Sequence, residues 1–129
     1  MFEYGKAVGI AFQLMDDILD YTGTEKELGK RPRQDLREGK VTLPLIHALR
    51  EADAADRRKA AALLGRAERS DRDIAFLARL VERHGGIRYT TTAAKTYVNH
   101  GKRILSVLPD SKARGALLSL SDYIVSRSA

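Results

Sequence analysis

The sequence predicts an all-α fold, a helical bundle, and two observations lead to this prediction. The 129 residues include three prolines, and β-branched residues are sparse outside a few short clusters. Apolar residues recur instead at the three- and four-residue spacing that is typical of amphipathic helices. With no internal repeat or second domain boundary in view, we predict that residues 1–129 form a single partial domain.

The first predicted helix runs from about Glu3 to Tyr21 and places three aspartates in an otherwise apolar stretch. At 100° per residue, Asp16, Asp17 and Asp20 fall within an arc of about 100°. Gln13 lies one turn earlier in the same arc. Because most of the other positions are apolar, we predict a buried helix whose acidic face lines a pocket or cleft.

The three carboxylates favour a bound divalent cation. Neighbouring carboxylates roughly 5–6 Å apart repel by about 3 kcal/mol at an effective dielectric constant near 20. A divalent cation reverses that repulsion, and a set of oxygen ligands alone suits Mg²⁺ better than Zn²⁺. The alternative is an N-capping or solvated acidic patch. The cluster, however, lies at the far end of an apolar helix, where negative charge opposes the helix dipole.

Gly5 and Gly9 lie one turn apart on or near the acidic face of this helix. A glycine inside a helix costs roughly 1 kcal/mol relative to alanine, so its presence calls for a reason. Two interpretations remain open at this point: the glycines permit close contact with another helix, or they leave room for a ligand.

Residues 25–40 show no sustained helical period, and a long loop is predicted there. Ordered loops of this length are usually functional or mobile. The loop is rich in Lys and Arg, and charges of this kind are commonly just solvated. Lys30 is the residue that we single out as a phosphate contact, and Lys40 is a second candidate.

The next two helices are predicted from their starts and their apolar spacing. One begins near Thr42 with Pro44 in its first turn, where a missing N–H costs little. A short, basic, alanine-rich helix over residues 54–64 follows, and we predict that it is peripheral. The apolar face of the first of these helices is predicted to contain Leu45, Ile46, Leu49 and Ala52.

Three further helices complete the chain. Ser70 and Asp73 have the form of a capping box that opens a helix ending at Gly85-Gly86. The following helix begins at Ile87 and is stopped by Pro109. Asp110 or Ser111 caps the last helix. Its inward-facing residues are predicted to be Ala113, Ala116, Leu117, Leu120 and Ile124.

Composition and charge disfavour several classes of function. The net charge is +6, but Lys and Arg are spread over every segment and interleaved with acidic residues, so no nucleic-acid partner is predicted. No apolar run approaches 18 residues, so we predict no membrane span. The start lacks the pattern of a signal peptide, and the absence of cysteine is compatible with the cytosol. We therefore expect a cytoplasmic location.

Three stretches together carry a resemblance to a known family. Gly9-Ile10-Ala11-Phe12-Gln13, followed by Asp16-Asp17-Ile18-Leu19-Asp20, resembles the second aspartate-rich motif of trans-polyprenyl diphosphate synthases. Leu28-Gly29-Lys30 and residues 35–46 are similar to the next block of that family. Gly85-Gly86-Ile87 and the closing helix over residues 117–127 are similar to its C-terminal end. The series is most like the long-chain, octaprenyl-type branch.

The resemblance implies the C-terminal part of the isoprenoid synthase fold, in which two aspartate-rich motifs face each other across a central cavity. In that family Mg²⁺ bridges the carboxylates to the diphosphate of an allylic prenyl diphosphate, which can then ionise. Isopentenyl diphosphate adds to the allylic cation and loses a proton. On this mapping the catalytic, metal-binding residues are Asp16, Asp17 and Asp20, and the substrate-binding residues are Gln13, Lys30 and Lys40.

The sequence departs from the family pattern in two ways. Arg33 stands where the family usually has a glycine, and a positive φ there would strain an arginine. The sequence also contains a single DDxxD, so the first motif is absent, and the chain resembles a synthase cut at the motif helix. We therefore expect an isolated chain that is inactive and forms a homo-oligomer through an exposed apolar face. The alternative is a non-catalytic, regulatory subunit that pairs with a complete synthase.

Overall fold

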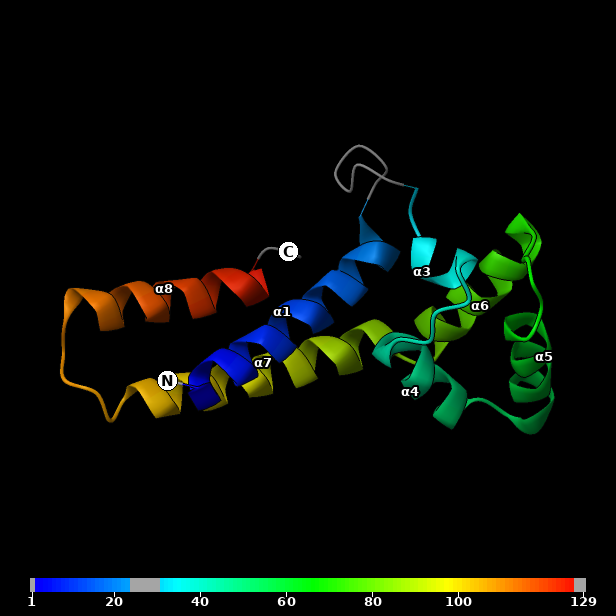
Figure 1. The fold of residues 1–129 in the computed structure, drawn as a ribbon. Coiled ribbons are helices and arrows are strands. Elements are labelled where there is room, and N and C mark those ends of the chain that lie inside the picture. The colour runs from blue at the N-terminus through cyan, green and yellow to red at the C-terminus, as the bar shows by residue number, and fades with distance from the viewer. Residues whose placement is uncertain (1, 24–30, 127–129) are drawn as a thin grey trace. The chain divides into compact units, whose positions relative to one another are not determined.

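The computed structural model describes residues 2–23 and 31–126, which form helices joined by turns and loops (Figure 1). No strand occurs in this part of the chain, so the predicted all-α fold is confirmed. The helices are α1 (Phe2–Thr22), α3 (Gln34–Arg37), α4 (Leu43–Glu51), α5 (Ala54–Leu64), α6 (Asp71–Arg83), α7 (Gly86–Leu105) and α8 (Lys112–Ser126).

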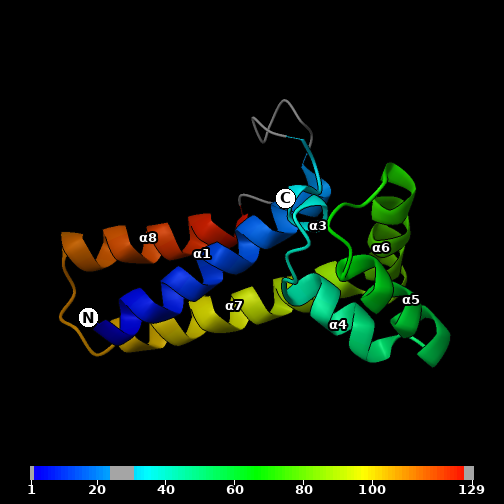
Figure 2. The same ribbon diagram turned by 45° about the vertical axis from the view of Figure 1, so that its right-hand side comes forward.

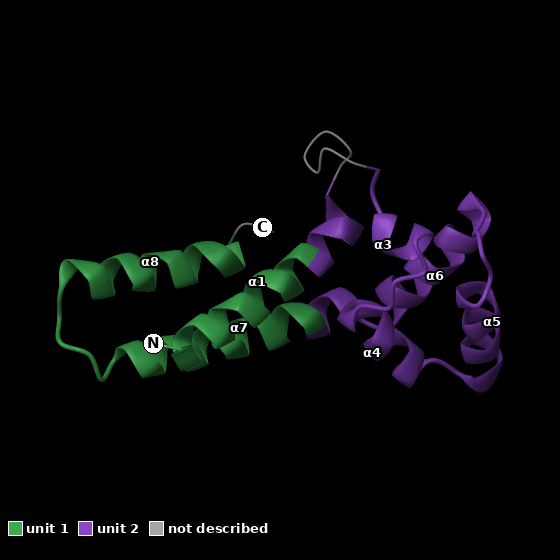
Figure 3. Ribbon diagram, viewed as in Figure 1, with its two compact units in different colours: residues 1–16, 90–129 green, residues 17–89 purple. Residues whose placement is uncertain are grey.

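The helices belong to two compact units, each of which is described by itself (Figure 3). Unit 1 comprises residues 1–16 and 90–129, and so contains most of α1, most of α7 and all of α8. Unit 2 comprises residues 17–89 and contains the end of α1, the helices α3 to α6 and the start of α7. The single partial domain expected from the sequence stays a prediction.

In unit 1, α1 lies alongside α7, as both views show (Figures 1 and 2). Gly101 of α7 allows this close approach, because a Cβ atom there would lie 3.3 Å from Cγ2 of Val8 and 3.4 Å from Cδ1 of Tyr4. The Tyr4 hydroxyl connects α1 to α8: it donates to the carbonyl oxygen of Leu117 at 2.9 Å and lies 2.9 Å from Oγ of Ser121. The side chains that α1 buries in unit 1 are Tyr4, Ala7, Val8, Ala11 and Met15.

Two faces of unit 1 differ from the sequence prediction. In α8 the predicted inward residues Ala113, Ala116 and Leu120 are exposed, whereas Ser121 is buried. Ser121 tolerates burial because its hydroxyl donates to the Leu117 carbonyl and meets the Tyr4 hydroxyl. The first helix is buried along one side only, since Phe12 is 44% exposed. Ile124 is buried and Leu117 half-buried, so the predicted inner face of α8 was wrong only for Ala113, Ala116 and Leu120.

Unit 2 has a continuous hydrophobic core in which α4 packs against α6 (Figure 2). At the start of α7, a Cβ atom on Gly86 would lie only 2.3 Å from the carbonyl oxygen of Pro44, so the contact between α7 and α4 requires glycine. Ile46 of α4 is 40% exposed, and its predicted place on the inner face was wrong. The core residues are Leu36, Leu45, Ala48, Ala60, Leu63, Ile74, Leu77, Ala78, Leu80 and Val81.

The predicted caps are found at two helix starts. The capping box of α6 is confirmed: the Asp73 N–H donates to Oγ of Ser70 at 3.1 Å, and the Ser70 N–H donates to Oδ2 of Asp73 at 3.0 Å. At α8 the cap is Ser111, whose Oγ accepts from the Arg114 N–H at 3.1 Å. Helix α5 has the predicted bounds, and its cap is Asp53, whose side chain accepts from the Asp56 N–H.

Candidate functional site

The predicted acidic residues lie toward the C-terminal end of α1. Gln13 is exposed and Asp16 is half-buried, while Asp17 and Asp20 are 7% and 2% exposed. In the part of the chain that the structure describes, no three His, Cys, Asp or Glu side chains are grouped so that they could hold a metal ion. A cation on this face would therefore need further oxygen ligands from water or phosphate, which is the way in which Mg²⁺ is usually bound.

The Asp20 carboxylate joins the end of α1 to the start of α3. Its Oδ1 accepts from the Gln34 N–H at 3.1 Å, and its Oδ2 accepts from the Asp35 N–H at 3.0 Å. The Arg33 N–H donates to the Asp20 carbonyl oxygen at 2.7 Å. Helix α3 has no cap from the side chain of its own N-cap residue. Asp20 takes that role, since an anionic acceptor suits the free N–H groups of a helix start.

Arg33 has the left-handed backbone conformation that the sequence analysis considered for this position. Its φ is +62° and its ψ is +32°, so the position that usually holds glycine in the resembled family does require a positive φ here. For a residue with a Cβ atom this conformation costs about 1–2 kcal/mol. The hydrogen bond from the Arg33 N–H to the Asp20 carbonyl oxygen helps to hold the backbone in this conformation.

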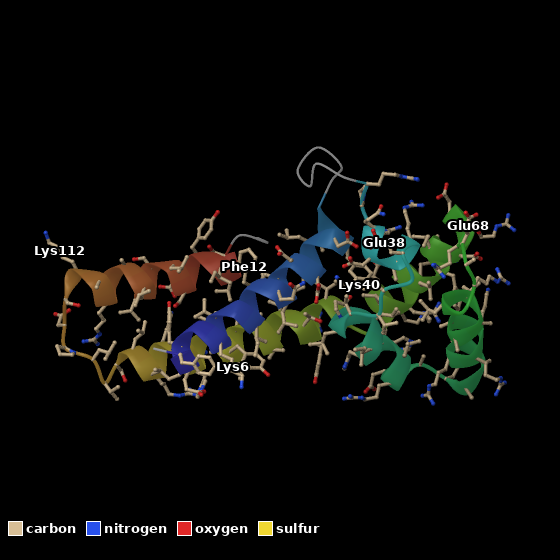
Figure 4. The ribbon with its side chains drawn as sticks, in the orientation of Figure 1. Lys6, Phe12, Glu38, Lys40, Glu68 and Lys112 are labelled. Atoms are coloured by element: carbon tan, nitrogen blue, oxygen red, sulfur yellow. The ribbon has the colours of Figure 1, made fainter. Side chains whose placement is uncertain are left out.

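Lys40 lies on the segment between α3 and α4, close to Glu38 (Figure 4). Its Nζ is 3.9 Å from Oδ1 of Asp35, and its backbone N–H donates to the Asp35 carbonyl oxygen at 2.8 Å. The Lys40 side chain is 55% exposed, so this long ion pair contributes little to stability and leaves the ammonium group accessible. Asp35 itself is 8% exposed.

The Arg69 guanidinium holds the same segment from the other side. It donates from Nε to the Leu36 carbonyl at 3.0 Å and from Nη2 to the Arg37 carbonyl at 3.2 Å. It also donates from Nη1 to the Arg66 carbonyl at 2.7 Å. The Leu36 and Arg37 carbonyls belong to the last turn of α3, and the Arg66 carbonyl belongs to the segment between α5 and α6. The segment that carries Asp35 and Lys40 is therefore fixed at both ends of α3.

Two buried hydroxyl groups lie beside the acidic residues and were missed by the sequence analysis. The hydroxyl oxygens of Tyr21 and Thr42 are buried, and neither has a hydrogen bond of normal geometry within the described residues. Burial, together with the carboxylates of Asp20 and Asp35, raises the pKa of the Tyr21 phenol above its usual range, and the Thr42 hydroxyl acts in the opposite direction. The phenol therefore remains a hydrogen-bond donor at neutral pH.

The structure thus brings Asp17, Asp20 and Tyr21 at the end of α1 into one unit with Asp35 and Lys40. Gln13 and Asp16 lie on the same helix but belong to unit 1. Lys30, the predicted phosphate contact, lies outside the described residues. Tyr21 was interpreted only as the last residue of a helix, although its position next to Asp20 was a signal that could have identified it.

Comparisons with known proteins bear on the family of this chain. Residues 1–81 match the model of the polyprenyl synthetase family. The chain is 36% identical, over 97% of its length, to a short chain isoprenyl diphosphate synthase of Methanothermobacter thermautotrophicus. It is 37% identical, again over 97% of its length, to the octaprenyl diphosphate synthase of Haemophilus influenzae. The chain spans 38% of the length of each of these relatives.

A solved structure extends the likeness to the fold. The polyprenyl synthase from Caulobacter crescentus, solved in complex with calcium and isoprenyl diphosphate, is 37% identical and superposes with a TM-score of 0.89. That match covers 98% of this chain and 39% of the other. No helix among the described residues is both long and apolar enough to cross a membrane. The resemblance inferred from the aspartate-rich motif is confirmed, and this chain belongs to the polyprenyl synthetase family.

Proposed function

We propose that this chain provides one side of the active site of a prenyltransferase that joins isopentenyl diphosphate head-to-tail to an allylic prenyl diphosphate. The observation that carries the proposal is the end of α1, where the Asp20 carboxylate accepts from the backbone of the segment that carries Asp35 and Lys40. Asp17 lies in the same unit as that segment. Family membership supports the reaction class, because the curated relatives are named as isoprenyl diphosphate synthases.

We propose that Asp16, Asp17 and Asp20 bind Mg²⁺. The donors fit this ion, because all are carboxylate oxygens and one or two carboxylates with substrate phosphates suffice for Mg²⁺. Each Asp20 carboxylate oxygen accepts one backbone bond from the start of α3, and a carboxylate has about four acceptor sites in all. When bound, Mg²⁺ would supply Lewis-acid neutralisation of the diphosphate.

We further propose that Gln13, Lys30 and Lys40 contact the substrate. The accessible ammonium group of Lys40 can act as a point charge on a diphosphate. Phe2, Gly5, Gly9 and Phe12 share one side of α1 by their spacing, and a Cβ atom on either glycine would meet nothing within 4 Å. Of the two interpretations left open for these glycines, this open surface favours space for a ligand, and we assign it to the hydrocarbon tail.

Exposed apolar side chains of unit 1 lead us to propose self-association of the isolated chain, which we expect to be inactive. Phe2 is 80% exposed and Tyr123 of α8 is 63% exposed, and large apolar patches commonly mark interaction sites. A compact monomer in solution scattering would contradict this proposal. A regulatory subunit that pairs with a complete synthase is the second candidate, and a pull-down with such a synthase tests it. The cytoplasmic location stays a prediction.

Titration calorimetry with Mg²⁺ and inorganic diphosphate tests the main proposal. The double variant Asp16→Asn/Asp17→Asn should bind the metal and diphosphate at least tenfold more weakly, because the ligands lose their charge. Glu68→Gln, at an exposed position between α5 and α6 (Figure 4), removes one acid elsewhere and should bind as the wild type does. Equal affinity of the double variant and the wild type would refute the metal assignment. Turnover of farnesyl and isopentenyl diphosphates by the isolated chain would refute its inactivity.

A further inference from the structure

We propose that a cavity in unit 2 binds an organic anion, namely one carboxylate or phosphate group on an apolar body. The cavity has a volume of about 430 Å³, which is within the usual range of small-molecule sites. Its lining includes Tyr21 and Arg33, the α6 residues Val81 and Glu82, and Ile87 and Arg88 of α7. Asp16, Asp17 and Lys40, which we assign to metal and diphosphate, do not line it.

Two arginines supply the positive charge of this cavity. Neither the Arg33 nor the Arg88 guanidinium has an ion pair or a side-chain hydrogen bond with another described residue. Arg37 and Arg66, by contrast, are paired with Asp71 at 2.8 Å and with Asp73 at 3.3 Å. Glu82 contributes the one negative charge in the lining, so the cavity carries a net positive charge.

The backbone of Arg33 strengthens the case for a ligand. A positive φ favours glycine, yet the chain has at this position a long, charged side chain that lines the cavity. Residues held in unfavourable backbone conformations are concentrated at functional sites. Glycine at position 33 would be less strained and would stabilise the folded protein. The presence of arginine instead indicates that its guanidinium group has a role at this position.

The apolar part of the lining indicates the rest of the ligand. Val81 is 1% exposed, and Ala78, Ile87 and the Tyr21 ring add further apolar surface to the cavity wall. Inorganic phosphate alone would reach the arginines but leave this wall in contact with water. A neutral hydrocarbon would cover the wall but leave both guanidinium groups unpaired. A single-chain amphiphile with an anionic head satisfies both parts of the lining.

Calorimetry of the full 129-residue chain with octyl phosphate, in EDTA, tests this proposal. Because no metal is present, the result is independent of the function proposed above. We expect octyl phosphate to bind at least tenfold more tightly than octanol or inorganic phosphate. Octanoate distinguishes a general anion site, where it binds as octyl phosphate does, from a phosphate-selective one. Equal binding of octanol would refute the charge requirement, and no binding of either octyl phosphate or octanoate would refute the site.

Three variants separate binding from folding. Arg33→Gly should weaken the binding of octyl phosphate at least tenfold. Its melting temperature should rise or stay unchanged, because glycine relieves the backbone strain. Arg88→Gln should weaken the binding of octyl phosphate to a similar extent. Arg79→Gln, at an exposed position of α6 that does not line the cavity, is the charge-matched control and should retain wild-type affinity. Wild-type affinity in both Arg33→Gly and Arg88→Gln would overturn the proposal.

Discussion

Unit 1 and unit 2 are built from the same kind of helix but use their apolar residues differently. In unit 2, ten buried residues from α3, α4, α5 and α6 form one cluster. Among the described residues, nine large apolar side chains are markedly exposed, and six of them belong to unit 1: Phe2, Phe12, Tyr97, Val107, Leu120 and Tyr123. The difference teaches that unit 2 gathers apolar side chains into one core, whereas unit 1 leaves large apolar side chains exposed, as surfaces that bind a ligand or another chain commonly do.

The largest expected effect on stability comes from removing a buried leucine of unit 2, compared with an exposed leucine of unit 1. Leu77→Ala should lower the free energy of unfolding by about 2–5 kcal/mol, because Leu77 is fully buried in the cluster of unit 2. Leu120→Ala, on the exposed side of α8, makes the same chemical change and should cost less than about 0.5 kcal/mol. Urea unfolding followed by circular dichroism measures both. A large cost for Leu120→Ala would show that this side of α8 is covered in solution.

A pair of glycines should give effects of opposite sign. Gly86→Ala places a methyl group 2.3 Å from the Pro44 carbonyl oxygen and 3.0 Å from Cγ1 of Val81, so it should destabilise unit 2 by about 1–3 kcal/mol. In α8 of unit 1, Gly115 has open space around it, and Gly115→Ala should stabilise the helix by up to about 1 kcal/mol. Thermal unfolding of the two variants compares them. Stabilisation by Gly86→Ala would contradict the close contact between α7 and α4.

A smaller effect is expected from the buried polar contact of unit 1. Tyr4→Phe removes the hydroxyl that donates to the Leu117 carbonyl and should cost about 1 kcal/mol. It should also speed amide exchange in α8, since the Tyr4 hydroxyl connects α1 to that helix. Tyr123→Phe at a 63% exposed position is the control, with almost no expected effect. Unchanged exchange in Tyr4→Phe would mean that apolar packing alone holds α8.

The smallest effect at neutral pH, and the one most dependent on pH, concerns Tyr21 of unit 2. Its pKa is raised in the folded state, so above pH 10, near the unfolded pKa, the folded protein binds more protons than the unfolded chain. Stability should then fall as the pH rises past that value. Tyr21→Phe should flatten the decline of the urea midpoint between about pH 9 and 11, whereas Tyr123→Phe should not. Parallel curves for the wild type and Tyr21→Phe would contradict the shift.

Local signals predicted the fold well. The Ser70 and Asp73 capping box lies within four residues, and the alanine-rich segment 54–64 is a continuous helix with the predicted ends. The left-handed conformation of Arg33 was inferred as a possibility from the glycine that the resembled family has there, and the structure has it. In each of these cases the physical cause lies within a few neighbouring residues.

Contacts between distant residues explain what the sequence did not reveal. Helix α3 was assigned to a loop because its cap is the side chain of Asp20, 14 and 15 residues before the amides that it accepts from. Ser121 is buried because of Tyr4, 117 residues earlier. Of the candidate site, the aspartates and Lys40 could be named from their motif. The Thr42 hydroxyl could not, since only the folded chain brings it near Tyr21, whereas Tyr21 directly follows Asp20 in the sequence.

The bonds that Asp20 makes to the amides of Gln34 and Asp35 also give this one residue two separate tasks. The Arg33 N–H donates to the Asp20 carbonyl oxygen, so the backbone and the side chain of Asp20 together hold the start of α3. Asp20→Asn would therefore remove a negative charge and weaken the side-chain anchor of the segment that carries Lys40 at the same time. A single residue thus couples the charge of the acidic face to the position of the nearby ammonium group.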